Sequence, residues 1–360
     1  MKTFSKTISF LAVVLLLASC DKDSIRTPDT SDDSSVDGGK VEMTFALSAS
    51  HLGGSLSLGS VTKAGSVNED QLHDLWILQF AGQSGEDTLK LCKYYPSEKI
   101  ADNKVSVALY ESSEPVRIYF IANVGSDKFA SLQTSETLAS FESQVLGMAD
   151  EAAVSGSGYL PMEGVYDGSI SFQEQSISLT RMVAKLSFTC TVDITAVDES
   201  FTITRLQLTD VATGTRYKAV EVPMSTTGLY PDASMSDNFK DYALESIDSS
   251  QGTSITRTWY LPENLRGVVE GLTSSTKGGD KTPAHSTCIE VSGDYVQGGI
   301  THDVTYRIYP GQNSSTDFNL IRNNSYTITS TIKGFNENDL RVVVEKGIPA
   351  GEYEDGIWSE

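Results

Sequence analysis

The sequence predicts a mainly β fold, built from two β-sandwiches that join near residue 180. Three observations lead to this prediction. Several segments alternate apolar and polar residues with a period of two, which is typical of half-buried strands. The 29 glycines and 10 prolines mark frequent turns between such segments. The chain is also long enough for about two domains of ~150 residues each.

The N-terminus predicts a signal peptide over residues 1–19. Lys2 and Lys6 precede an apolar run from Ile8 to Leu17, which is shorter than the ~20 residues that span a bilayer. The last residues, Leu-Ala-Ser-Cys, resemble a bacterial lipobox, and the resemblance implies cleavage before Cys20 and lipidation of that residue. Cys20 would then anchor the mature chain to a membrane. The alternative is an ordinary signal peptide with an incidental cysteine.

Residues 20–39 are predicted to form an acidic flexible tether, because they contain almost nothing apolar to bury. Their acidic residues are also similar to a surface-export signal, and both interpretations stay open. Cleavage would leave 341 residues (360 less 19) with a formal charge of −23, since two lysines leave with the signal. This negative balance argues against a nucleic-acid partner and against direct docking on anionic lipid.

The strands of the first sandwich are predicted from three patterns. Residues 40–49 and 104–110 alternate apolar and polar side chains. Residues 71–82 and 116–125 are almost continuously apolar, as expected of central strands covered on both faces. In contrast, Leu138, Phe141, Val145 and Met148 recur at helical spacing, which predicts one amphipathic helix over residues 135–149.

The second sandwich is predicted from similar alternation. Residues 185–194, 301–311 and 325–334 each read as half-buried strands, with Cys190 on the apolar face of the first. In residues 201–211 the apolar phase slips between Ile203 and Leu206, which predicts a β-bulge.

The search for catalytic chemistry finds no candidate. The four histidines show no spacing that places two of them on one element with a carboxylate. No cofactor or metal site is predicted, and the chain is not expected to be an enzyme. Cys92, Cys190 and Cys288 are far apart and odd in number, so at most one disulfide could form and the sequence does not say which.

Several segments in a fixed order resemble the fimbrillin superfamily of Bacteroidales, the lipoprotein-derived subunits of surface pili. These segments, which follow the lipobox and tether and extend to about Arg341, read KVEMTFALSA, VTKAGS, QLHDLWILQFAG, VRIYFIANVG, GYLPMEG, LTRMVAKLSF and YRIYPGQNSSTDFNLIRNNSYTITSTIKG. The resemblance implies two transthyretin-like β-sandwich domains in tandem, with a short helix in the first. It also implies a structural subunit of a cell-surface fimbrium (pilus), with other fimbrial subunits as partners and a role in adhesion to a host or bacterial ligand.

The family's assembly by strand exchange implies roles for particular residues. A protease cuts after a basic residue, the first strand leaves, and a strand of a neighbouring subunit fills the groove. Here the implied plug strand carries Val41, Met43, Phe45 and Leu47 on one face, and the implied cut lies between Lys63 and Ala64. Shaft subunits usually have arginine at the cut. Lysine at this position favours either a lysine-specific protease or an anchor subunit that keeps its plug.

The C-terminal tail is the candidate donor strand. Its apolar residues are Val342, Val344, Ile348, Tyr353, Ile357 and Trp358. Pro349 and two glycines interrupt their alternation, and proline is disfavoured within a strand. The tail is therefore expected either to donate or to pack on its own domain, and a tail that cannot donate would indicate a tip or accessory subunit. The sequence leaves the shaft, tip and anchor roles open.

These inferences give a set of boundaries and one rival function. The segments are residues 1–19 (signal peptide), 20–39 (tether), 40–63 (plug strand and propeptide), 64–180 (first sandwich), 181–345 (second sandwich) and 346–360 (tail). The expected location is the cell surface, as an outer-membrane lipoprotein. The alternative is a surface glycan-binding lipoprotein of stacked β-sandwiches, which would need exposed aromatic residues such as Trp259 to stack on sugars.

Overall fold

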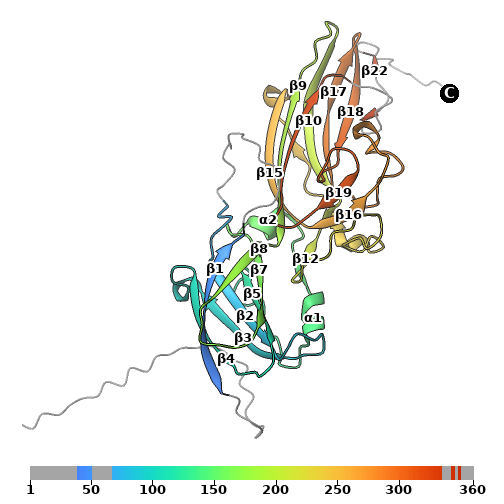
Figure 1. Cartoon of the computed structure of the whole chain (residues 1–360). Helices are drawn as coiled ribbons and strands as arrows, with labels where there is room; N and C mark the ends of the chain where they lie inside the picture. Colours follow the sequence, from blue (N-terminus) through green and yellow to red (C-terminus); the bar gives the residue numbers. More distant parts are fainter. Residues whose placement is uncertain (1–38, 51–66, 335–341, 345–347, 350–360) are drawn as a thin grey trace, which may run out of the picture. The chain divides into compact units, whose positions relative to one another are not determined.

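The computed structural model describes residues 39–50, 67–334, 342–344 and 348–349, and within them the fold is mainly β, as predicted (Figure 1). Cys20, Lys63, Ala64, Tyr353, Ile357 and Trp358 lie outside the described residues. No helix of the described segments is long and apolar enough to cross a membrane.

The N-terminal half forms a seven-stranded sheet in the order β3-β2-β5-β7-β8-β1-β4. Its strands are β1 (Lys40–Ala49), β2 (Asp74–Phe80), β3 (Leu89–Pro96), β4 (Lys104–Tyr110), β5 (Val116–Ala122), β7 (Met162–Gly168) and β8 (Gln175–Arg181). One apolar core joins side chains of β1, β4 and β8 with those of β2, β3 and β5. The sheet thus folds over its own core. The continuously apolar strands β2 and β5 lie inside the sheet, as predicted, and every residue of β2 is buried.

The outer face of β2 and β5 is covered by a second core, which contains both α-helices. These are α1 (Leu138–Ser143) and α2 (Glu151–Ser155). Leu138 and Phe141 of α1 are buried there, and Thr137 caps the helix by accepting a hydrogen bond from the backbone N–H of Ser140.

The single helix predicted over residues 135–149 was wrong beyond Ser143, and α2 was missed. Residues Val145–Gly147 form strand β6, which pairs with β12 (Gly214–Arg216). Val145 is 50% exposed although its spacing predicted burial. The pairing partner lies about seventy residues downstream. A local 3.6-residue pattern cannot anticipate it, because the backbone bonds are satisfied by a distant segment.

The C-terminal half forms two sheets that enclose one core. The first has the order β14-β10-β17-β18-β21, with β22 also pairing with β18. The second has the order β15-β9-β20. The strands are β9 (Val183–Val192), β10 (Glu199–Thr209), β14 (Glu245–Ser246), β15 (Ser254–Pro262), β17 (Cys288–Gln297), β18 (Ile300–Ile308), β20 (Ser325–Ile332), β21 (Val342–Val344) and β22 (Ile348–Pro349).

Smaller elements complete the described chain. They are β11 (Val211–Ala212), β13 (Phe239–Lys240), β16 (Asn264–Val268), β19 (Asp317–Leu320) and the 3₁₀ turns Ser97–Lys99, Ser236–Asn238, Ser249–Gln251 and Ser274–Thr276. Two sequence predictions are confirmed here. The register of β10 against β17 shifts between Ile203 and Arg205, which is the predicted bulge, and Cys190 is fully buried in the core. The three described cysteines are free thiols.

Candidate functional site

Strand β1 is hydrogen-bonded on both of its edges. It pairs antiparallel with β4 and parallel with β8, beside which it is drawn in blue in Figure 1. Its four alternating apolar residues are buried: Val41, Met43, Phe45 and Leu47 are between 0% and 8% exposed. The first described strand is therefore an inner strand of its sheet, although it stands at the start of the fold.

The side chain of Phe45 makes two aromatic ring contacts in the core. Its ring packs edge-on against Phe120 of β5, with 4.7 Å between ring centroids, and against Tyr166 of β7 at 5.8 Å. On the opposite face of the strand, the hydroxyls of Thr44 and Ser106 lie 2.9 Å apart. One face of β1 fills the core and the other carries small polar groups.

A groove would remain between β4 and β8 if β1 left the sheet. Its two walls would present the backbone N–H and C=O groups that now bond β1, and its floor would present four apolar pockets. Unpaired strand edges bind extended segments, with the backbone supplying affinity and alternate side chains supplying specificity. The arrangement around β1 can thus hold one extended strand with an alternating apolar face.

The tail residues that the structure describes lie on another sheet edge. Strand β21 pairs antiparallel with β18, matching Val344 with Val304, and β22 pairs with the same strand, matching Ile348 with Thr301. Val342, Val344 and Ile348 thus add to the chain's own C-terminal sheet. The described part of the tail pairs with its own domain in this chain, and a donor role for the tail stays a prediction.

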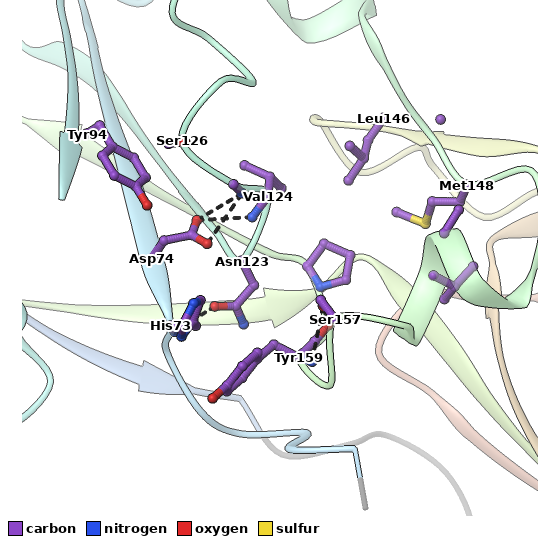
Figure 2. A pocket seen from close by; sticks show the side chains of 15 residues that line it. His73, Asp74, Tyr94, Asn123, Val124, Ser126, Leu146, Met148, Ser157 and Tyr159 are labelled. Carbon is purple, nitrogen blue, oxygen red and sulfur yellow. Dashed lines mark hydrogen bonds between the residues drawn. The ribbon is translucent and has the colours of Figure 1, made fainter. Parts of the chain in front are cut away.

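A separate cleft of about 590 Å³ lies beside the start of β2 (Figure 2). Asp74, which is 5% exposed, accepts hydrogen bonds from the backbone N–H groups of Val124 and Gly125. His73 stacks on Tyr159 with ring centroids 4.5 Å apart. The carboxylate of Asp74 is thereby used to hold the turn after β5. Sequence analysis did not predict this cleft.

A buried ionic cluster involves Glu163 of β7, Glu263 and Arg322. Arg322 forms a salt bridge with Glu263 and donates a 2.6 Å hydrogen bond to Thr215 Oγ1. Burial raises the pKa of Glu163 to about 7, the charge of Arg322 opposes this shift, and the charge of Glu263 adds to it. The cluster is built from elements far apart in the sequence, and sequence analysis gave no indication of it.

Nucleophilic and metal chemistry gain no support from the described residues. Burial raises the pKa of the Cys92 and Cys190 thiols to about 12, so neither is a ready nucleophile. Within the described segments no three His, Cys, Asp or Glu side chains are close enough together to hold a metal ion.

Trp259, which was named for sugar stacking, is buried in the structure, and so is Trp76. Trp76 is 5% exposed and donates its indole N–H to the backbone oxygen of Gly125, and Trp259 is 8% exposed. Neither offers a ring face to a glycan.

Comparison with known proteins shows which fold this is. Residues 259–330 match the family model described as "Domain of unknown function (DUF4906)". No curated protein sequence matches the chain.

Three solved structures from Bacteroidales resemble this chain. A proposed cell adhesion protein from Parabacteroides distasonis is 15% identical, with a TM-score of 0.54 over 88% of this chain and 98% of that chain. One from Bacteroides eggerthii is 13% identical, with a TM-score of 0.52 over 88% and 97%. The tip fimbrial protein Mfa3 from Porphyromonas gingivalis, with a C-terminal truncation, is 15% identical, with a TM-score of 0.47 over 85% and 98%. The chain shares the fold of the first two proteins, so the resemblance read from the sequence is confirmed at the level of the fold.

Proposed function

We propose that this chain is a structural subunit of a cell-surface fimbrium with a role in adhesion, and that it assembles with other subunits by strand exchange at the site of β1. The observation that carries the proposal is the position of β1. It is the first described strand, its four apolar residues are buried, and both of its edges are paired. The fold shared with proposed cell adhesion proteins supports the same role.

The proposed assembly begins with a cut between Lys63 and Ala64. This bond lies between β1 and the next described segment, which begins at residue 67. A cut there would leave β1 attached to its sheet by non-covalent contacts alone. Lipidation at Cys20 would attach the uncut chain to the outer membrane, so cutting would also separate the fold from its anchor.

The donor strand is proposed to come from another subunit rather than from a second copy of this chain. The groove fits four alternating apolar residues, with an aromatic ring at the third position against Phe120. In the tail, the series that starts at Val342 and Val344 continues with Lys346. A lysine at the third position would place a charge in an apolar pocket, which is costly. This mismatch supports a tip or accessory role.

A reversible disulfide tests whether β1 must leave. Thr44 and Ser106 are register partners with touching hydroxyls, a geometry suited to a cross-strand disulfide in the double variant Thr44→Cys, Ser106→Cys. Thr189 and Thr256 are register partners between β9 and β15, with hydroxyls 3.3 Å apart, and supply a matched control away from β1.

The assay measures uptake of a labelled synthetic peptide of residues 41–50 after digestion with a lysine-specific protease. The wild type and the oxidised control pair are expected to bind the peptide, whereas the oxidised Thr44→Cys, Ser106→Cys protein binds it only after reduction. The proposal would be overturned if the cleaved wild type took up no peptide. It would also be overturned if the oxidised Thr44→Cys, Ser106→Cys protein took up as much peptide as the wild type. Terminal sequencing of protein recovered from cells adds a direct check, because a chain that starts at Ala64 has been cut.

A further inference from the structure

Arg181, the last residue of β8, holds two distant backbone segments together. Its side chain is almost fully buried. The guanidinium donates from Nη1 to the backbone oxygen of Ser50 at 2.7 Å and from Nε to that of Glu69 at 2.9 Å. It also donates to Oδ1 of Asn323 at 2.8 Å and forms a salt bridge with Asp70.

The two carbonyl groups bound by Arg181 belong to either side of the proposed cut. Ser50 directly follows β1, and Glu69 lies beyond Lys63 and Ala64 in the sequence. A planar guanidinium can bond several acceptors at once in fixed directions, and such charge-assisted bonds are stronger than neutral ones. Cutting the chain at Lys63 would leave both of these bonds in place.

Ser50 has further partners that strengthen this attachment. Its hydroxyl accepts a 3.0 Å hydrogen bond from Nδ2 of Asn323, and its backbone N–H donates to the oxygen of Leu179 at 2.8 Å. The opposite end of β1 pairs with β4 alone, because the register with β8 begins only at Phe45. Lys40 is exposed, and Val41 is the most exposed of the four apolar residues of the strand.

We propose that Arg181, together with Asn323, is a positioning residue that retains the C-terminal end of β1 after the chain is cut. Cleavage and strand release are then two separate steps, and β1 leaves from its Lys40 end. An incoming donor strand displaces β1 from that end and reaches the Arg181 contact last. This inference rests on the proposed function. The attachment of β1 by Arg181 can nevertheless be measured in the uncut chain without a partner subunit.

Hydrogen exchange of the uncut full-length protein, read by mass spectrometry, provides that measurement. Arg181→Gln is expected to accelerate exchange in residues 41–50 by about 10- to 100-fold relative to β5, which is the effect of losing charge-assisted bonds to a carbonyl. Arg181→Lys can restore one bond, so its exchange rate in residues 41–50 is expected to lie between those of wild type and Arg181→Gln. Asn323→Ala keeps the Arg181–Ser50 bond, so about 3- to 10-fold is expected. This milder variant serves if Arg181→Gln does not fold.

The matched control is Arg266→Gln. Arg266 is also fully buried and donates to backbone oxygens, those of Leu265 and Pro231, but none of its described contacts is with β1. Its loss is expected to leave the ratio of β1 to β5 exchange unchanged. Equal acceleration of β1 and β5 in Arg181→Gln, or no acceleration in either Arg181→Gln or Asn323→Ala, overturns the inference.

A second experiment separates this inference from the proposed function. After digestion with a lysine-specific protease, the β1 fragment is expected to dissociate about 10- to 100-fold faster from Arg181→Gln than from wild type. Equal dissociation rates would overturn the retaining role of Arg181 while leaving strand exchange intact. If the groove accepts no peptide in either protein, strand exchange is overturned. The ratio of hydrogen exchange in β1 to that in β5 would still establish the contact between Arg181 and the end of β1.

Discussion

Replacing Phe45 by alanine tests whether side chains, rather than the backbone ladder, hold β1 in its sheet. Alanine keeps the N–H and C=O groups that pair with β4 and β8, and it removes a fully buried ring that packs against Phe120 and Tyr166. Loss of a buried phenylalanine costs about 3–5 kcal/mol, and its two edge-on ring contacts place Phe45 toward the upper part of that range.

The expected loss of about 4 kcal/mol has two different consequences. In the uncut chain it lowers the free energy of unfolding, because β1 is part of the folded sheet. In the cut chain β1 is a bound fragment, so the same loss weakens its retention by about a thousandfold. The first quantity is measured by urea denaturation followed by circular dichroism, which reports on both halves of the chain and leaves Trp76 and Trp259 in place. The second is measured as fragment dissociation after lysine-specific cleavage.

Phe188→Ala is the control for this prediction. Phe188 is fully buried in the C-terminal core, where its ring stacks on Trp259 at 6.4 Å. Its replacement is expected to destabilise the C-terminal half by a similar amount without changing the retention of β1. A loss below about 1 kcal/mol for Phe45→Ala, or equal fragment release from both variants, would refute the reasoning.

Two further predictions concern the buried ionic cluster. The pKa of Glu163 is raised to about 7 by burial, so its protonation favours the folded state, and this stability is present below pH ~4.5 and lost as the pH rises through 7. The stability of Glu163→Gln should therefore match that of wild type near pH 4 and exceed it at pH 8 by roughly 3 kcal/mol. Thermal melts at both pH values measure this difference, and a variant less stable than wild type at pH 8 would contradict it. Arg322→Met should cost about 3–5 kcal/mol, because it leaves the buried carboxylate of Glu263 without its cation. Denaturation at pH 7 measures that loss, and a loss below about 1 kcal/mol would contradict the reasoning.

Local sequence patterns were sufficient to predict eight of the described strands, which are β1, β2, β4, β5, β9, β10, β18 and β20. Alternation over residues 40–49 placed Val41, Met43, Phe45 and Leu47 on one face, and the structure buries all four. The bulge of β10 was also readable, since a slip in apolar phase is a local signal. The prediction of a helix over residues 135–149 was wrong at Val145–Gly147, because the backbone of these residues pairs with the distant strand β12.

The sequence alone determined that this chain is mainly β, that residues 40–49 form a strand with one buried face, and that its organisation resembles a surface pilus subunit. Only the tertiary structure decided that this strand is an inner one, because pairing with β4 and β8 joins segments about sixty and one hundred and thirty residues away. The same holds for Arg181. A charged residue at the end of a strand is ordinarily solvated, and the folded chain buries it by bringing carbonyl groups from both sides of Lys63 to its guanidinium. Which backbone groups lie next to one another depends on the whole fold, and the apolar periodicity of the sequence does not predict it.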